Sequence, residues 1–225
     1  RSGDFVLRRH AKGCMLICCY TGSDLRTRGV IPEIDAASDL NLSVEFDHIH
    51  LHPDIRHVPF PFDTSIRHLH QHHDNTRPVR IGHAPTNRAA KGSDLIIPVL
   101  EQLERDENTQ TVLIENMPYD QAMRAKQHCD LFVDQIGDLG YGINALEALA
   151  MHIPVASCLA DGFEMRYPDH PFIPVNAENL YTRLLPLIRD PELRRKTGEQ
   201  GAEWVARTHD SLQVVRRIHT LAGID

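Results

Sequence analysis

The sequence has no apolar run that could cross a bilayer, because its apolar segments fall well short of the roughly 20 residues that a membrane-spanning helix needs. It has five cysteines, Cys14, Cys18, Cys19, Cys129 and Cys158, which form no Cys-x-x-Cys pair, and most of them lie within apolar runs. Such cysteines are typical of buried free thiols in a reducing compartment. These absences argue against a membrane-spanning or disulfide-stabilised protein and predict a cytoplasmic location.

A net positive charge is absent, and aromatic residues are scarce. The formal net charge is -7, which argues against nucleic acid as a partner but leaves room for a local basic pocket. Aromatic residues make up 6% of the chain, so a polysaccharide-binding surface built on exposed rings has little support. What is present is 225 residues, 41% of them hydrophobic, which suffices for one large domain or one domain plus part of another.

Histidine is unusually frequent, and several of the fifteen histidines cluster in "DHIHLHPDIRH" and "RHLHQHH". Imidazole is a common transition-metal ligand, so these clusters raise the question of a metal site. No cysteine or carboxylate partner recurs there at the spacing of metal ligands, which favours a polar, exposed turn and linker. The sequence therefore predicts no metal site.

The first part of the chain contains short strands. "CMLICCY" is an apolar run that ends before a glycine turn at Gly22, and "LNLSVEF" and "IRHVPF" indicate two further strands. Residues 63–78 are polar and lack periodicity, which is typical of a linker. We therefore expect a domain over residues 1–62, a linker over 63–78 and a second domain over 79–225.

The second part alternates between strands and helices. Strands are expected at "PVRIGHA", "TQTVLIE", "DLFVDQ", "PVASCL" and "PFIPV", with helices at "SDLIIPVLEQLERD", "YDQAMRAKQHC", "GINALEALAM", "AENLYTRLLPLIRD", "PELRRKTGEQGAEWVARTH" and "SLQVVRRIHTLAG". Strands joined by crossover helices form a parallel sheet covered on both faces. Ligands bind such sheets beyond the carboxyl ends of the strands, so the segments that follow the strands are the candidates for function.

The segment after the first of these strands, "GHAPTNRAAKGSD", carries two cations close to the start of a helix. Arg88 and Lys91 beside free helical amides suit a phosphate group, although a surface loop with solvated basic residues explains them equally well. The GxxxxGK[ST] spacing of a Walker loop is absent. The segment after the next strand, "IENMPYD", places Glu115 and Asn116 at the same edge, where they could read a base or merely connect a strand to a helix.

The segment "GDLGYGINALEALAM" joins glycines to a helix that is apolar except for Asn144 and Glu147. Glycine lets a backbone approach a ligand closely, and the first amides of a helix that begins near Gly142 and Ile143 would face that ligand. Glu147 is costly to bury alone. A ribose diol would satisfy its carboxylate, and so would an internal salt bridge with a lysine or arginine. We favour the ligand, so the three segments together predict a pocket for a nucleotide with a diphosphate.

These motifs resemble those of the group 1 retaining glycosyltransferases of the GT-B fold. "GYGINALEALAMHIPVA", "GHAPTNRAAKGSDL" and "IRDPELRRKTGEQGAEWV" are similar to parts of that family's donor domain in order and spacing, from Val79 to the C-terminus. "YTGSDLRTRG" and "HPDIRHVPFPFD" resemble the end of its acceptor-side domain. The resemblance implies an α/β, GT-B-like chain with a complete C-terminal Rossmann-like parallel-sheet domain and part of an N-terminal one, whose first part lies outside this sequence.

The resemblance also implies a function. Such enzymes move a sugar from a nucleotide-diphosphate sugar, here UDP- or GDP-linked, to a glycan or lipid-linked acceptor without a metal or another cofactor. Arg88 and Lys91 would offset the charge on the leaving diphosphate. Glu147 would hold the ribose, and the backbone of Gly142, Ile143 and Asn144 would cap the phosphates.

In the first domain, the resemblance implies that Asp24, in a catalytic role, and Arg26 face the acceptor or the transferred sugar. The sequence departs from the family pattern at Leu139, where many members carry a glutamate, and at Thr21, where relatives often carry histidine. These departures support a second interpretation, a non-catalytic protein or subunit that binds nucleotide sugars. A sugar-nucleotide epimerase of the same architecture would need a pair of acid–base carboxylates, and no convincing pair is visible.

The last two predicted helices are rich in arginine. A basic amphipathic face can contact anionic lipid, so peripheral contact with the inner face of a membrane is one interpretation. Glutamates interleave with the arginines at Glu192, Glu199 and Glu203, which favours an ordinary solvated face instead.

Overall fold

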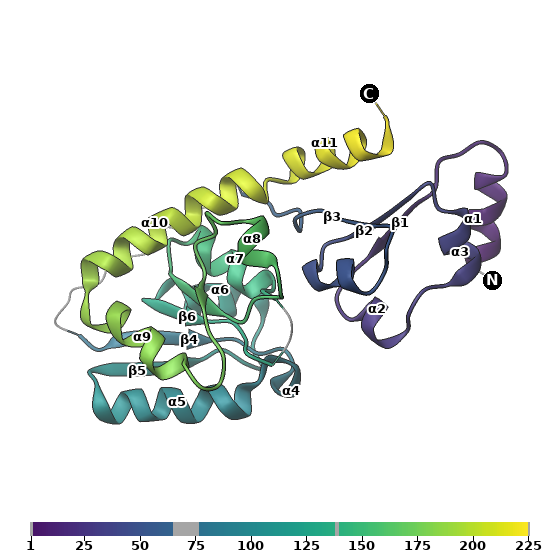
Figure 1. Cartoon of the computed structure of the whole chain (residues 1–225). Helices are drawn as coiled ribbons and strands as arrows, with labels where there is room; N and C mark the ends of the chain where they lie inside the picture. Colours follow the sequence, from purple (N-terminus) through teal and green to yellow (C-terminus); the bar gives the residue numbers. More distant parts are fainter. Residues whose placement is uncertain (1, 65–76, 138–139, 225) are drawn as a thin grey trace. The chain divides into compact units, whose positions relative to one another are not determined.

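The computed structural model describes residues 2–64, 77–137 and 140–224. The chain divides into two compact units, one formed by Arg1–Asp63 together with Thr208–Asp225, and the other by Thr64–Arg207 (Figure 1). The predicted end of the first domain, at residue 62, lies next to this division. Most of the linker that was predicted over 63–78 lies outside the described residues.

The first unit is built on a three-stranded parallel sheet. Its strands are β1 (Ile17–Tyr20), β2 (Leu40–Ser43) and β3 (Ile55–His57), paired in the order β1-β2-β3. The helices of this unit are α1 (Ser2–His10), α2 (Asp24–Thr27), α3 (Pro32–Ala37), the 3-10 helix η1 (Phe46–His50) and α11 (Ser211–Ala222). All three strands lie within segments that the sequence predicts as strands.

The second strand is shorter than the predicted segment "LNLSVEF". Strand β2 ends at Ser43, and η1 begins at Phe46. The hydroxyl of Ser43 accepts a hydrogen bond from the amide of Glu45 at 3.0 Å and donates one to the carbonyl of Tyr20 at 3.2 Å. A serine side chain that bonds to the backbone two residues on stabilises a turn in competition with the strand, which ends β2.

The C-terminal helix corrects the predicted domain boundaries, which assigned everything from residue 79 to 225 to the second domain. Helix α11 belongs to the first unit. Its buried Val214 packs against Leu42 and Val58 of that unit, and the amide of Ser211 donates to the carbonyl of Phe62. The apolar face of α11 is visible in the sequence, but the pattern does not state which core it covers.

The second unit contains a five-stranded parallel sheet in the order β5-β4-β6-β7-β8, as its alternating pattern predicts. Its strands are β4 (Val79–His83), β5 (Thr109–Leu113), β6 (Leu131–Val133), β7 (Val155–Ser157) and β8 (Ile173–Pro174). Its helices are α4 (Arg88–Lys91), α5 (Ser93–Asp106), α6 (Tyr119–Gln127), α7 (Ile143–Ala150), α8 (Phe163–Arg166), α9 (Leu180–Arg189) and α10 (Pro191–Thr208).

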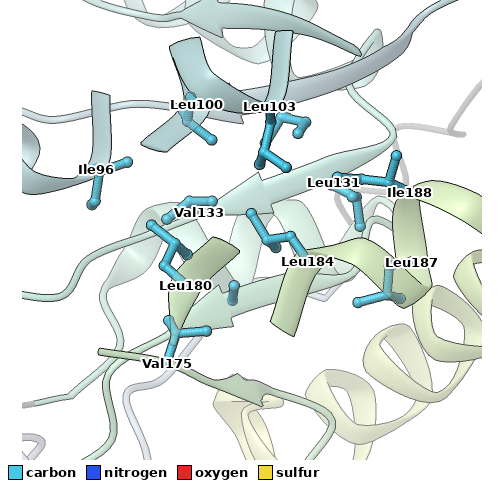
Figure 2. Close-up of a cluster of buried hydrophobic side chains, with 12 residues drawn as sticks. Ile96, Leu100, Leu103, Leu131, Val133, Val175, Leu180, Leu184, Leu187 and Ile188 are labelled. Carbon is cyan, nitrogen blue, oxygen red and sulfur yellow. The ribbon is translucent and has the colours of Figure 1, made fainter. Parts of the chain in front are cut away.

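A core of aliphatic side chains joins this sheet to α5 and α9 (Figure 2). Helix α5 contributes Ile96, Leu100 and Leu103, which recur at the spacing of one helical face. Leu131 and Val133 of β6 point into the same core. Burying each such side chain contributes roughly 1.5–3 kcal/mol before the cost of chain entropy.

The other face of the sheet is covered in part by α6 and α7. Side chains alternate along a strand, so Phe132 points away from the core that Leu131 and Val133 share, and it contacts the ammonium group of Lys126 on α6. Helix α7 buries Ala145, Leu146, Glu147, Ala148 and Leu149. The helix that sequence analysis singled out for its isolated glutamate is therefore a buried crossover helix.

Candidate functional site

The carboxyl ends of β4 and β5 open into a cavity of about 630 Å³ in the second unit. Residues from the segments that follow these strands, and from α6 and α7, line it. Six of the residues that the sequence predicts for nucleotide binding are among them: Lys91, Glu115, Asn116, Ile143, Asn144 and Glu147. The structure thus brings together three segments that are far apart in the chain.

Buried His83 fixes the start of the first segment. Its Nδ1 lies 2.8 Å from the carbonyl of Val133, and its Nε2 lies 2.8 Å from the hydroxyl of Ser93. A carbonyl only accepts, so Nδ1 carries the proton, and the neutral ring accepts from Ser93. Burial lowers the pKa of His83, which agrees with a neutral ring. This histidine ties β4 to β6 and to the first residue of α5.

Arg88 lies on α4 and pairs with Glu115. Its Nε and Nη2 donate to the two carboxylate oxygens at 2.8 Å and 2.6 Å, a bidentate arrangement, and these bonds lower the pKa of Glu115. Arg88 is not itself among the residues that line the cavity, whereas Glu115 is. Two residues to which the sequence assigns separate ligand contacts therefore also bind each other.

Lys91 lines the cavity and pairs with Asp134, whose side chain is 1% exposed. The Lys91 ammonium lies 3.1 Å from Oδ1 of Asp134, and Oδ2 accepts the amide of Gly142 at 2.7 Å. A single carboxylate therefore contacts the cation and one of the amides that were predicted to hold a diphosphate. Sequence reasoning missed Asp134, although its place directly after a strand, at the carboxyl edge of the sheet, was a usable signal.

Glu147 is buried and forms an ion pair with Lys126 of α6. The internal salt bridge that the sequence left open as an alternative is thus present, and Glu147 nevertheless lines the cavity. The same lysine donates to Oδ1 of Asn144 at 2.5 Å, and the side-chain Nδ2 of Asn144 donates to the carbonyl of Ala84 at 2.9 Å. Sequence reasoning missed Lys126, which occupies the buried face of its helix three residues after Met123.

The loop after β5 approaches the same carboxylate. Asn116 adopts a positive φ of 52°, a left-handed conformation that asparagine tolerates better than most residues. It leads into α6, where burial and then the negative charge of Glu147 raise the pKa of Tyr119. Tyr119 and Glu147 both line the cavity.

The glycines that were predicted to admit a ligand serve partly to bring loops together. A Cβ atom at Gly137 would lie 2.5 Å from the backbone nitrogen of Gly92, so these two loops touch backbone to backbone. A Cβ atom at Gly142 would lie 2.9 Å from the Lys91 ammonium. Gly142 therefore leaves room for Lys91, and it is not among the residues that line the cavity.

Asp24 belongs to the first unit, on α2, where its carboxylate lies 3.8 Å from Arg28. Arg26 of the same helix forms two hydrogen bonds of 2.6 Å with Asp47. Neither Asp24 nor Arg26 is among the residues that line the cavity, and the roles given to them remain predictions. Leu139 lies outside the described residues.

Two further features bear on the sequence predictions. Within residues 2–64, 77–137 and 140–224, no cluster of three or more histidine, cysteine, aspartate or glutamate side chains could hold a metal ion. The "RHLHQHH" segment, residues 67–73, lies outside these ranges. Across the same described ranges, no helix is both long enough and apolar enough to traverse a bilayer.

No protein-family model matches this chain, and no curated protein sequence matches it either. Its fold is nevertheless similar to those of several solved structures. Sucrose-phosphate synthase from Thermosynechococcus elongatus matches with a TM-score of 0.63 and 12% identity, over 91% of this chain and 66% of that one. An alpha-glucosyltransferase in complex with UDP and a 13-mer DNA matches with a TM-score of 0.65 and 12% identity, over 93% of this chain and 71% of that one.

Anabaena HepE, in complex with UDP-glucose, matches with a TM-score of 0.61 and 13% identity, over 92% of this chain and 72% of that one. These neighbours are GT-B glycosyltransferases, so the α/β, GT-B-like fold that the sequence predicts is confirmed. The chain spans 66% of the length of the sucrose-phosphate synthase and 46% of TarM, another neighbour. Structural similarity at identities this low establishes the fold alone, so the activity must be argued from the site.

Proposed function

We propose that this protein is a glycosyltransferase that moves a sugar from a nucleotide-diphosphate sugar to a glycan or lipid-linked acceptor, with retention of configuration. One observation carries the proposal: in a GT-B-like fold, the cavity beyond the carboxyl ends of the strands gathers Lys91, Glu115, Asn116, Asn144 and Glu147. Its volume of about 630 Å³ lies within the usual range for small-molecule sites.

Each part of a nucleotide sugar has a candidate partner in this arrangement. Glu147 would accept hydrogen bonds from the ribose hydroxyls, and the loop at Glu115 and Asn116 would lie against the base. Lys91 and the backbone near Gly142 would hold the diphosphate. The same cation and amide would offset the charge that grows on the diphosphate as its bond to the sugar breaks and the acceptor oxygen bonds to the sugar carbon. The proposal requires no metal or other cofactor for this step.

A second function is favoured by the way the cations near the cavity are paired. Arg88 pairs with Glu115, Lys91 with Asp134 and Lys126 with Glu147. Carboxylates thus oppose the charges that a leaving diphosphate would use. Together with Leu139 and Thr21, this pairing supports a non-catalytic protein or subunit that binds a nucleotide sugar. The two functions differ in turnover and agree on the ligand.

Calorimetric titration of the chain with UDP and with GDP tests the ligand that both functions share. We expect one of these nucleotides to bind, and we expect Glu147→Ala to weaken it at least tenfold, because loss of a charged hydrogen-bond partner costs about 1.5–3 kcal/mol. Exposed Glu203 of α10 offers a matched control, since Glu203→Ala should leave the affinity unchanged. Failure of both nucleotides to bind the unaltered chain would contradict the proposal.

Turnover then separates the two functions. The assay uses the nucleotide sugar that contains the nucleotide found to bind. It measures the release of free nucleotide in the presence of candidate acceptors. Nucleotide release that depends on Lys91 would support the transferase, because Lys91→Met removes the cation nearest to the predicted diphosphate. Tight binding with no release by the unaltered chain would favour the non-catalytic function.

A further inference from the structure

Lys126 is among the largest fully buried side chains in the described residues, although lysine is usually exposed. Its position on α6 places it on the buried face of that helix, over the ring of Phe132, with the ammonium 5.7 Å from the ring centroid. The same side chain lines the cavity. A buried ammonium beside a candidate ligand site needs an explanation, because burial of a lone charge is costly.

The contacts of Lys126 supply that explanation. Its ammonium bonds at once to Oε2 of Glu147 and to Oδ1 of Asn144, both on α7. Asn144 is anchored in turn by its bond to the carbonyl of Ala84, just after β4. Lys126 therefore joins α6 to the two polar side chains of α7 that the sequence singles out.

These contacts fix the orientation of the Glu147 side chain. The adjacent ammonium bonds to one of its oxygens, Oε2, and this limits the rotamers of the side chain. An ionised carboxylate has about four acceptor positions, so the bond to Lys126 leaves others for hydroxyl groups in the cavity. A carboxylate fixed in this way meets a diol without first being reoriented.

We propose that Lys126 is a positioning residue of the nucleotide site, which holds the Glu147 carboxylate in the orientation that recognises the ribose 2′- and 3′-hydroxyls. The inference rests on the proposed function and adds a residue that determines preference for a ribonucleotide over a deoxyribonucleotide. A purely structural pair, which only fastens α6 to α7, is the alternative. That alternative predicts a loss of stability and no change in this preference.

The test compares the affinities of UDP or GDP, whichever the unaltered chain binds, and of its 2′-deoxy counterpart. We expect the unaltered chain to bind the ribonucleotide at least fivefold more tightly. Lys126→Met should reduce this preference to less than twofold, and Glu147→Gln should do the same. The ratio of two affinities is insensitive to a general loss of folded protein, which a structural role would cause.

Arg77→Met provides a matched control. Arg77 forms a partly buried ion pair with Asp130 at 2.8 Å in the same unit, and neither residue lines the cavity. This variant should lose stability and retain the full ribonucleotide preference. If Lys126→Met does not fold, Lys126→Gln is the second variant, because glutamine keeps a hydrogen-bond donor while it removes the charge. The preference of this variant for the ribonucleotide should fall below threefold.

The outcomes separate the two proposals. A folded Lys126 variant that keeps the full preference, alongside a Glu147→Gln variant that loses it, would overturn the positioning role and leave the proposed function standing. An unaltered chain that binds neither diphosphate would overturn the proposed function and the inference with it. Loss of the preference in the Lys126 and Glu147 variants, but not in Arg77→Met, would support both.

Discussion

Lys91 and Asp134 form an ion pair of 3.1 Å at the carboxyl edge of the second sheet. The same carboxylate accepts the amide of Gly142, so it occupies two of the groups that a diphosphate would use. The side chain of Asp134 is almost fully buried, and that of Lys91 is 12% exposed. A diphosphate bound at this edge would therefore compete with the Asp134 carboxylate for Lys91 and the Gly142 amide, or share them with it.

Asp134→Asn should increase the affinity for a nucleoside diphosphate by about three- to tenfold and leave the affinity for the free nucleoside unchanged. The substitution removes a negative charge beside the predicted phosphates, and two unit charges 4 Å apart interact by about 1 kcal/mol in water and about 4 kcal/mol near a protein surface. Calorimetry with UDP and uridine, or with GDP and guanosine, measures both affinities. Asp169→Asn, an exposed site of the same unit, is the control. Weaker diphosphate binding in Asp134→Asn would instead show that Asp134 orients Lys91.

Gly198→Ala should destabilise the second unit by at least about 2 kcal/mol, because the added methyl group would overlap the backbone carbonyl of His152. Gly201→Ala, one turn further along α10, is the matched comparison. There the methyl group would meet the end of the Leu149 side chain at 2.6 Å, which can shift more easily than a backbone. Both changes gain about 1 kcal/mol of helix propensity, so urea unfolding of the two variants isolates the contact. Equal losses would contradict the prediction.

Val214→Ala should destabilise the first unit by about 1–3 kcal/mol, because it leaves a cavity between α11 and the sheet where Val214 packs against Leu42 and Val58. Val215→Ala on the exposed face of α11 is the control and should change stability by less than about 0.5 kcal/mol. Hydrogen exchange of β2 amides in the two variants reports where the loss occurs. Loss of protection confined to the second unit would contradict the assignment of α11 to the first.

The first unit should lose stability as the pH falls from about 6.5 to 4. Burial lowers the pKa of His209 to about 4, while its Nδ1 bonds to the carbonyl of Phe60 at 2.7 Å. The unfolded chain, with an ordinary histidine pKa near 6.5, then takes up a proton that the folded chain does not. The contribution is complete above pH 6.5 and is lost as the pH falls, by up to about 3 kcal/mol.

Urea unfolding between pH 7.5 and 4 in His209→Gln tests this contribution. The variant should be less stable at pH 7.5 and should show a shallower loss on acidification. His219→Gln, at an exposed position on α11, should keep the slope of the unaltered chain. A slope that stays the same in His209→Gln would show that other groups, such as paired carboxylates, cause the acid loss.

Much of the fold is predictable because it follows from local patterns. The alternation of apolar runs and amphipathic segments after residue 78 predicts the parallel sheet and its crossover helices, and the parallel sheet identifies the edge where a ligand site forms. The end of β2 at Ser43 and the attachment of α11 to the first unit escaped prediction. The end of β2 depends on one hydrogen bond between the Ser43 side chain and the backbone. The attachment of α11 depends on which of the two cores its apolar face packs against.

The site is predictable in its residues and less so in its pairings. Sequence reasoning places Lys91, Asn144 and Glu147 at one edge, and the structure brings them to one cavity. It does not find Lys126 or Asp134, since their importance arises from contacts across 21 and 43 residues of the chain. The role of Glu147 toward a ribose, like those of Arg88 and Asp24, remains a prediction.

The close backbone contact between Gly92 and Gly137 has a mechanical consequence. A hydrogen bond from the amide of Ile136 to the carbonyl of Lys91, at 3.1 Å, reinforces it. The end of α4, which carries Lys91, and the loop that leaves β6 are thus fastened to each other backbone to backbone. A displacement of one segment would therefore require the other to move with it. If the cavity binds a nucleotide sugar as proposed, substitutions on the α6 side would alter that binding with less disturbance to the backbone than substitutions at this junction.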